Sequence, residues 1–256
     1  MSQYFLNCWV VICLFIAPLS LSGKTSLPFL PGEKLEYSLK WGFIPVGFAT
    51  MEVSPRKHGD EEPWQIRFSV RTNNFADKFY KVRTNITSLV DSNFTRSLKY
   101  IKSQQEGKTK KEIVVQFDYD EEKVVFTENK QTPRLLPLKR NVYDPLSIAF
   151  AFRFHPSTPQ EKKTFPTCDG KKFLDVRLNV GKKSKIDVPY GSFLANDVVP
   201  DMKNLSGVFK KSPKGILRVW YSSDNRRIPV KISSKVVVGS FTAQLLKARG
   251  LQKKEN

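Results

Sequence analysis

Residues 35–41 read Leu-Glu-Tyr-Ser-Leu-Lys-Trp, a stretch in which bulky apolar and polar side chains alternate without a break. A period of two places the apolar side chains on one face of a β-strand and the polar side chains on the other. The run ends at residues 42–47 (GFIPVG), where glycines and a proline favour a turn, and the strand pattern resumes at 48–53. The two runs therefore predict a β-hairpin with one buried face.

The same pattern recurs along the chain at intervals of about ten residues. Further strands are predicted at 64–71, 80–89, 97–103, 112–119, 123–127, 173–180, 185–189, 215–221, 227–233 and 236–245. Turn-forming residues separate them at 118–122, 169–170, 181–183 and 222–225. Pro229 places its strand at a sheet edge or at a bulge, because proline has no N–H to donate. We expect an all-β fold, a single domain of strongly curved antiparallel sheet that is half-barrel or sandwich-like.

Residues 145–154 depart from this pattern and predict one short, buried helix. Asp144 and Pro145 are typical of a helix start, because aspartate accepts hydrogen bonds from free N–H groups and proline suits the first helical position. Residues 146–154 carry apolar side chains on nearly all sides, and Pro156 follows them. We therefore expect the helix to pack on or into the sheet.

Eight aromatic residues could face one interior between the sheet and this helix. They are Tyr37, Trp41, Phe68, Phe79, Phe150, Phe152, Phe154 and Trp220. Such an interior could leave a cavity for an acyl chain or another apolar ligand. Plain core packing explains the same residues and is the favoured interpretation.

Residues 1–22 are predicted to be a signal peptide. The first 23 residues carry no charged side chain, and an apolar run spans 8–19. This run suits the h-region of a secretion signal and is too short to cross roughly 30 Å of hydrocarbon. No Lys or Arg precedes the run, so a buried N-terminal helix is the alternative. We expect a mature β domain at 23–251 with a flexible tail at 252–256, exported to the periplasm or cell envelope of a bacterium.

Positive charge is concentrated toward the C-terminus of a chain with a formal net charge of +19. Residues 24–160 hold 22 basic and 16 acidic side chains (net +6), and residues 161–256 hold 21 and 8 (net +13). Outside the cytoplasm, the expected partners of such a surface are anionic lipid, lipopolysaccharide or a wall polymer, and not nucleic acid. A basic face that only aids solubility is the alternative. The candidate anion-binding residues, from the dense region 203–235, are Lys210, Lys211, Lys214, Arg218, Arg226 and Arg227.

Residues suited to catalysis or to metal binding are few. The two histidines are His58, in a charged turn, and His155, at the end of the predicted helix, where its position needs no chemical role. Cys168 is the one cysteine after the leader, so no intramolecular disulfide is expected, and we interpret it as an unreactive thiol beside a turn. The chain has no G-x-S-x-G motif, glycine-rich phosphate loop or Cys-x-x-Cys pair. We expect no catalytic site, no metal site and no cofactor.

Several segments resemble the DUF3108 family of exported bacterial envelope proteins of unassigned function. The resemblance lies in 31–47 (PGEKLEYSLKWGFIPVG), in 144–147 (DPLS) with Arg153, in 188–193 (VPYGSF), in Trp220 with Asp224 and 226–230 (RRIPV), and in 238–245 (VGSFTAQL). These segments follow one another along nearly the whole mature chain. The resemblance implies a single β-rich periplasmic domain and no known catalytic residues.

Three functions remain open from the sequence. The leading hypothesis is a non-enzymatic envelope protein that binds an anionic amphiphile or surface polymer through a curved sheet and the basic region 203–235. The second is a scaffold that joins an envelope assembly by contact with another protein. A hydrolase that uses His58 or His155 is a minor third hypothesis.

Overall fold

A computed structural model describes residues 27–56, 62–201, 217–235 and 239–254 of the chain. These residues form one antiparallel sheet of fourteen strands and two short helices. The first half of the chain contains β1 (Glu33–Trp41), β2 (Ile44–Pro55), β3 (Trp64–Thr72), α1 (Asn74–Asp77), β4 (Val82–Val90), β5 (Ser97–Glu106), β6 (Thr109–Asp118), β7 (Lys123–Glu128) and β8 (Arg134–Pro137). The second half contains α2 (Ser147–Phe154), β9 (Lys162–Cys168), β10 (Phe173–Val188), β11 (Gly191–Pro200), β12 (Leu217–Ser222), β13 (Pro229–Lys235) and β14 (Ser240–Arg249).

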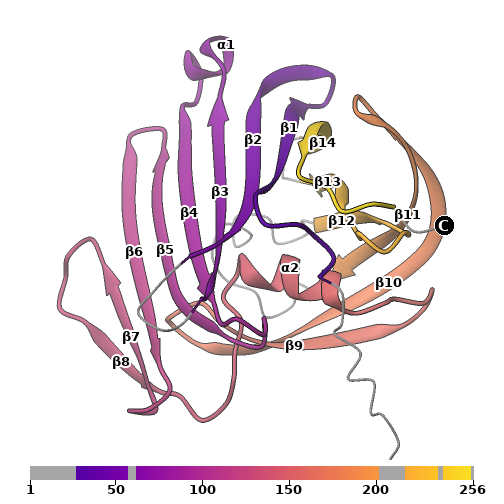
Figure 1. The fold of residues 1–256 in the computed structure, drawn as a ribbon. Helices are drawn as coiled ribbons and strands as arrows, with labels where there is room; N and C mark the ends of the chain where they lie inside the picture. Colours follow the sequence, from indigo (N-terminus) through magenta and orange to yellow (C-terminus); the bar gives the residue numbers. More distant parts are fainter. Residues whose placement is uncertain (1–26, 57–61, 202–216, 236–238, 255–256) are drawn as a thin grey trace, which may run out of the picture.

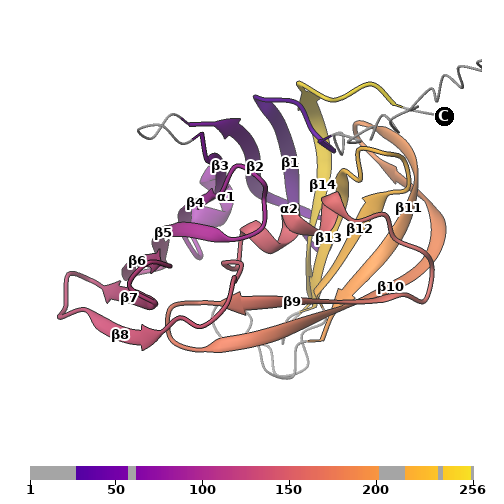
Figure 2. The same cartoon turned by 60° about the horizontal axis from the view of Figure 1, so that its bottom comes forward.

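Neighbouring strands in the sheet are consecutive in sequence except at one junction, where β1 pairs with β14. The strand order is β8-β7-β6-β5-β4-β3-β2-β1-β14-β13-β12-β11-β10-β9, so the first and last strands pair in the middle. At this junction Trp41 lies opposite Phe241 and Leu39 lies opposite Ala243. Two antiparallel meanders are thereby joined into one sheet, which curves around α2 (Figures 1 and 2). The predicted all-β fold with a strongly curved antiparallel sheet is confirmed.

The alternation predicted for residues 35–41 is confirmed from Leu35 to Ser38 of β1, whereas Trp41 is exposed. Leu35 and Tyr37 are fully buried on the concave face, whereas Glu36 and Ser38 are partly exposed on the other. The hydroxyl of Tyr37 donates a hydrogen bond to the carbonyl of Pro229, at 2.8 Å. The aromatic side chain therefore supplies core contacts and also fixes the start of β13.

The predicted turn at residues 181–183 is wrong, because β10 runs through it from Phe173 to Val188. The strand passes this point with a bulge between Val180 and Lys183 in its pairing with β11. A Cβ on Gly181 would lie 1.7 Å from the Oδ1 atom of Asp197. Gly181 therefore allows the close approach of a neighbouring strand and does not reverse the chain.

Three strands were not predicted from the sequence. They are β8, β9 and β11. β8 has four residues, and β9 contains Pro166. Short strands and strands with proline have weak local signals, so they depend on pairing with their neighbours.

Pro229 begins β13, which lies between β12 and β14 inside the sheet. The pairing of β12 with β13 shifts register between Trp220 and Tyr221, opposite Pro229. Of the two predicted alternatives, the bulge is confirmed and the edge position is wrong. The register shift accommodates a residue that has no N–H to donate.

The predicted helix is confirmed as α2, and it lies inside the curve of the sheet (Figure 2). Phe150 packs in the larger apolar core, and Phe152 packs in a second cluster with Tyr221. Pro145 lies in the turn that precedes the helix, because the helix itself begins two residues later at Ser147. Asp144 still caps the free N–H groups of the turn, as expected.

Only some of the eight aromatic residues predicted to face the interior lie there. Tyr37, Phe150 and Phe152 are buried. Phe68, Phe154 and Trp220 are partly buried against the core. Trp41 is 40% exposed and Phe79 is 77% exposed, so the expectation that these two face the interior is wrong. Both lie at turns at one end of the sheet, where the strands do not cover them.

Among the described residues, neither helix has the length and apolar character that crossing a membrane requires.

Candidate functional site

Arg153 lies at the centre of a buried hydrogen-bonded cluster near the C-terminal end of α2. Its Nη1 atom donates to Oε1 of Glu33 at 2.6 Å, and its Nη2 atom donates to Oε2 of the same carboxylate at 2.9 Å. Neither side chain has appreciable exposed surface. Removing one member of such a pair leaves an unpaired buried charge and destabilises a fold by about 3–5 kcal/mol. The pair therefore fastens the beginning of β1 to α2.

The same guanidinium also holds the hairpin between β12 and β13. Its Nε and Nη2 atoms donate to the carbonyl of Arg226 at 3.0 and 2.9 Å. Nη2 donates further to the carbonyl of Pro28, at 3.0 Å. Arginine suits this position because its planar group presents several donors in fixed directions. Three segments far apart in sequence thus meet at one side chain.

Arg226 and Arg227 follow each other in this hairpin but make different contacts. The Nη2 atom of Arg226 donates to Oδ2 of Asp224 at 2.6 Å, and its Nε atom donates to Oδ1 at 3.2 Å. Arg227 donates through Nε to the carbonyl of Arg153, and no described carboxylate forms an ion pair with it. Burial, and then the positive charge of Arg153, lower the pKa of Arg227. Its Nη atoms therefore remain without a carboxylate partner in the described part of the chain.

Asp144 forms a second buried cluster where the chain enters α2. Its Oδ1 atom accepts from the backbone N–H groups of Leu146 and Ser147, at 2.8 and 3.0 Å. Its Oδ2 atom accepts from the hydroxyls of Ser88 and Ser97. Burial raises the pKa of Asp144, and the four donors act in the opposite direction. The carboxylate joins β4, β5 and the helix start, which is a structural role.

A pocket of about 140 Å³ lies between the end of α2 and the β12–β13 hairpin. Its walls include Phe152, Pro156, Asn196, Tyr221, Ser223 and Arg227. Asn196 is 6% exposed, and its Oδ1 atom has no hydrogen-bond partner. Buried polar atoms in folded proteins are nearly always paired, so this amide is an exception that needs a reason.

Six exposed aromatic side chains gather at one end of the sheet, and we call them the aromatic rim. They are Trp41, Phe43, Phe75, Phe79, Tyr80 and Phe241. The turns after β1, β3 and β13 carry them, and antiparallel order brings these turns to the same end (Figure 1). Phe43 is 99% exposed and Phe79 is 77% exposed. A concentrated set of exposed aromatic residues on a protein surface is typical of an interaction site.

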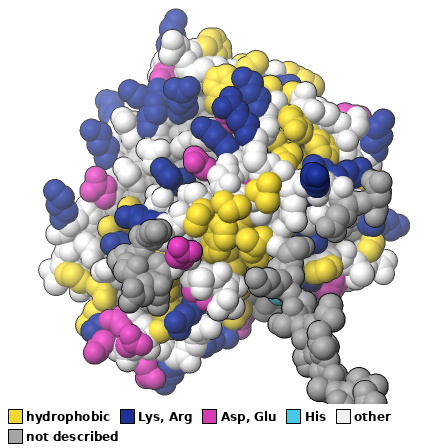
Figure 3. Space-filling model, in the orientation of Figure 1, with side chains coloured by type: hydrophobic (Ala, Val, Ile, Leu, Met, Phe, Trp, Pro, Cys, Tyr) yellow, Lys and Arg dark blue, Asp and Glu magenta, His cyan; other side chains and the backbone are white. Residues whose placement is uncertain are grey.

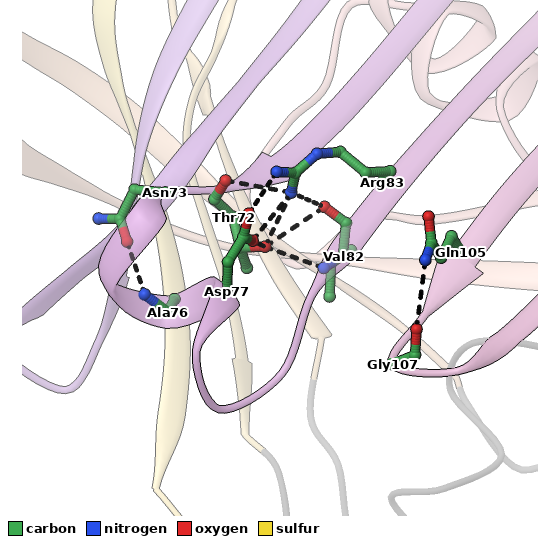
Figure 4. Close-up of polar contacts among 8 residues, drawn as sticks. All are labelled: Thr72, Asn73, Ala76, Asp77, Val82, Arg83, Gln105 and Gly107. Atoms are coloured by element: carbon green, nitrogen blue, oxygen red, sulfur yellow. Dashed lines mark hydrogen bonds and ion pairs between the residues drawn. The ribbon is translucent and has the colours of Figure 1, made fainter.

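The segment that presents three of these side chains is held rigidly (Figure 4). Oδ1 of Asn73 accepts from the N–H of Ala76 at 2.9 Å, which caps α1. Nη1 of Arg83 donates to Oδ1 of Asp77 at 3.0 Å, across the base of the turn between β3 and β4. These contacts fix the turn while the rings of Phe75 and Phe79 remain outside.

Five exposed cations surround the aromatic rim, and we call them the rim cations. They are Arg71, Lys78, Lys81, Lys108 and Lys110. All lie at the same ends of β3, β4, β5 and β6 as the rim. Figure 3 shows hydrophobic side chains next to Lys and Arg side chains along this upper end. The described carboxylate of Asp77 is already paired there with Arg83.

The structure places the six predicted anion-binding residues in different surroundings. Lys210, Lys211 and Lys214 lie outside the described residues. Arg218 pairs with Asp197 at 3.2 Å and lies 5.8 Å from the ring centre of Trp220. Arg226 and Arg227 lie in the hairpin that holds Arg153. The structure thus brings Arg226 and Arg227 to one place, and anion binding by the set stays a prediction.

The candidate catalytic residues of the sequence have ordinary surroundings where they are described. His58 lies outside the described residues, and His155 ends α2. Burial, followed by the charges of Lys163 and Arg227, lowers the pKa of His155. Burial raises the pKa of the Cys168 thiol to about 11. Within the described ranges, no three His, Cys, Asp or Glu residues are grouped so that they could hold a metal ion.

A hollow of about 420 Å³ lies over β4, β5 and β6, with Thr87, Leu89, Lys99 and Ile101 in its wall. These residues alternate with the buried Ser88 and Tyr100, so they face outward from the curve. This hollow is therefore not the interior cavity that the sequence left open as the alternative to plain core packing.

Sequence reasoning missed the aromatic rim and Asn196. Phe43 and Phe75 carried a usable signal, because bulky apolar residues in turns between predicted strands are not needed for a core. Asn196 carried none, since a lone polar residue in a strand does not reveal whether a partner will reach it.

Comparisons with known proteins identify a family and a fold. A family model described as a protein of unknown function (DUF3108) matches residues 36–246. Among solved structures, a β-barrel-like protein of the domain of unknown function DUF1849 from Brucella abortus has a TM-score of 0.59 and 13% identity, covering 88% of this chain and 99% of that one. A protein from Bacteroides fragilis with a YmcC-like fold, proposed to be exported, has a TM-score of 0.30 and 10% identity over 86% and 98% of the two chains, too low to support an inference. No curated protein matches the sequence.

Proposed function

Because the chain belongs to the DUF3108 family of unknown function, its role has to be inferred from its own surfaces, and we propose that it binds anionic lipid membranes in the bacterial envelope. The protein acts by binding and catalyses no reaction. The aromatic rim supplies the apolar contact, and the rim cations supply the charge. The observation that supports this most directly is the grouping of both sets at one end of the sheet.

The chemistry of the rim matches that of a lipid–water interface. Tryptophan and tyrosine side chains favour this region, where the ring leaves water and the polar edge stays hydrated. Phenylalanine side chains supply apolar contact there. Transferring a phenylalanine side chain out of water contributes about 1.5–3 kcal/mol, and each Lys or Arg close to an anionic surface adds about 1 kcal/mol. Phe43 and Phe79 are exposed enough to make this transfer without any change in the fold. A few such residues suffice for reversible attachment.

Two features of the sequence agree with this proposal. The leader at 1–22 would send the domain to a compartment bounded by membranes. The net charge of +13 after residue 160 favours approach to anionic headgroups and includes Lys235, at the same end of the sheet as Phe241. Lys235 therefore adds to the attraction that the rim cations provide.

Vesicle sedimentation tests the proposal. The purified mature protein should sediment with vesicles that contain phosphatidylglycerol, and much less with vesicles of phosphatidylcholine alone. Binding should weaken as salt rises, because ions screen charges over roughly 8–10 Å at physiological ionic strength. The double substitution Phe43→Ser and Phe79→Ser should weaken binding at least about tenfold, since each ring contributes more than the 1.4 kcal/mol that corresponds to a factor of ten.

Leu135→Ala is the matched control. Leu135 is 67% exposed but lies on β8, at the far edge of the sheet, so its truncation should leave vesicle binding unchanged. Both variants should keep the melting temperature of the wild type, because exposed side chains contribute little to folding. Equal binding to neutral and anionic vesicles would overturn the proposal, and so would wild-type binding by the double variant.

A further inference from the structure

The pocket beside the β12–β13 hairpin contains a polar group that the fold leaves unpaired. Asn196 lies in β11, is more than nine-tenths buried and lines the pocket. Its Oδ1 atom accepts no hydrogen bond. Rotation of the amide about its terminal bond exchanges Oδ1 and Nδ2, so the group can offer the pocket an acceptor or a donor. A ligand with both kinds of group would satisfy it.

Arg227 adds an uncompensated positive charge to the same pocket. In the cluster around it, Arg153 is neutralised by Glu33, and Arg226 is neutralised by Asp224. Arg227 uses only Nε, toward the carbonyl of Arg153. Its Nη1 and Nη2 atoms form no hydrogen bond with any described residue, so a planar pair of charged donors remains for a partner.

The backbone of Arg227 has an unusual conformation. Arg227 has a φ of +44°, a left-handed conformation that is unfavourable for a long side chain. A residue held in this way is kept in place by its surroundings. From this position the Nε atom of Arg227 donates to the carbonyl of Arg153 at the end of α2.

The size and walls of the pocket limit what could occupy it. A volume of about 140 Å³ accommodates a small organic molecule or one end of a larger one. Phe152, Pro156 and Tyr221 supply apolar surface, while Asn196 and Arg227 supply the polar contacts. Asp224 also borders the pocket, but it is already bound by Arg226 and by the hydroxyl of Ser222.

We propose that this pocket binds a small carboxylate that carries a hydrogen-bond donor on its α-carbon, such as an α-hydroxy acid or an N-acylated amino acid. The carboxylate pairs with the Nη atoms of Arg227 and with Nδ2 of Asn196. The neighbouring O–H or N–H donates to Oδ1 of Asn196. A short side chain rests against Phe152. This site is separate from the aromatic rim and does not depend on membrane binding.

Titration of the purified protein with a matched set of small molecules tests the site. Lactate has the carboxylate and the donor, propionate lacks the donor, lactamide lacks the charge, and inorganic phosphate has the charge in another shape. In NMR titrations of the 15N-labelled protein, lactate should give saturable shifts and should bind more tightly than the other three. No saturable shift with lactate would overturn the proposal. Equal binding of propionate would overturn the role of the donor, and stronger binding of phosphate would overturn the assignment to a carboxylate.

Two substitutions separate binding from folding. Arg227→Gln should weaken lactate binding roughly ten- to hundredfold, the loss expected for a charge-assisted hydrogen-bonded contact. Asn196→Leu should abolish the preference for lactate over propionate and should raise the melting temperature, because it replaces an unpaired buried amide by an apolar group of similar size. If Asn196 only supported the fold, Asn196→Leu would lower the melting temperature and keep the preference for lactate. A lower melting temperature for Asn196→Leu would therefore overturn the proposal.

Arg218→Gln is the control for general charge effects. Arg218 lies on the adjacent strand with its own carboxylate, Asp197, and outside the pocket. The Arg218→Gln variant should bind lactate as tightly as the wild type does. Vesicle binding should be the same for Arg227→Gln and the wild type, so failure of either proposal would be seen separately.

Discussion

Arg226 and Arg227 are consecutive and carry the same side chain, yet the structure gives them different chemistry. Arg226 is neutralised by Asp224 two residues earlier, a contact within one turn. The contact of Arg227 is with the carbonyl of Arg153, 74 residues away in sequence. Sequence reasoning grouped the two as equivalent candidates for anion binding, because nothing local distinguishes them. The structure shows that Asp224 pairs with Arg226, so Arg227 is the guanidinium of the two that has no carboxylate partner among the described residues.

Asp144 allows a test of a buried charge at the same scale. Burial raises its pKa, so the folded protein binds this proton more tightly than the unfolded chain does. The contribution of this tighter proton binding to the free energy of unfolding is complete at pH values below the ordinary aspartate range. The contribution is lost as pH rises from that range through the raised pKa. Asp144→Asn has no such proton, so its stability relative to the wild type should increase across this window.

Urea denaturation at a series of pH values measures this difference. An asparagine at position 144 still accepts from the N–H groups of Leu146 and Ser147 and can donate to Ser88 and Ser97. Asp144→Ala is the contrasting variant and should be destabilised at every pH, because these donors lose their acceptor at about 1–3 kcal/mol for each unsatisfied group. A constant difference between Asp144→Asn and the wild type over the acid range would contradict the prediction.

At the scale of the elements, β10 shows how a turn signal can be overruled. Residues 181–183 (GKK) have the composition of a turn, but the strand continues through them with a bulge. Pairing on both sides, with β9 and β11, provides backbone partners for a strand of sixteen residues. Such pairing outweighs local composition, because most of the free energy of a sheet comes from cross-strand contacts.

The helix α2 was predictable because its signals are local. They are the Asp-Pro pair at its start and the proline that follows it.

Gly181→Ala tests why glycine occupies the bulge. The new Cβ would lie 1.7 Å from Oδ1 of Asp197 and 2.6 Å from its Cγ. Asp197 must move away and lose its ion pair with Arg218, so we expect a loss of about 1–3 kcal/mol in the free energy of unfolding. Asp197→Ala in the same chain should recover most of this loss, which a double-mutant cycle in chemical denaturation would measure. If the effects of the two substitutions on the free energy of unfolding simply add, the clash is not the cause of the loss.

At the scale of the whole molecule, the two ends of the sheet meet at a seam. The turn between β9 and β10 packs on β6 and β7: a Cβ on Gly170 would lie 2.5 Å from the ring of Phe126 and 2.7 Å from Val115. Lys171 pairs with Glu128 at 2.6 Å across the same contact. The seam brings the first and second halves of the chain together around α2 (Figure 2).

Cys168 reports on the opening of this seam. It is 1% exposed, and burial raises the pKa of its thiol to about 11. At pH 8 roughly one thiol in a thousand would be a thiolate with that pKa, and the thiolate is the reactive form. The mature protein should therefore resist iodoacetamide when folded and react at the rate of an ordinary thiol in urea. Rapid labelling of the folded protein, read by mass spectrometry, would show that the seam opens easily.

The sequence by itself determined the strand-forming character of the chain, the buried helix after Asp144 and the family. These depend on local alternation, on capping and on ordered segments that can be read along the chain. Only the tertiary structure decided that β10 is continuous, that Trp41 and Phe79 belong to an exposed rim, and that Asn196 and Arg227 line the same pocket. Each of these results depends on which distant residue reaches a given atom, and curvature of the sheet around α2 sets those distances.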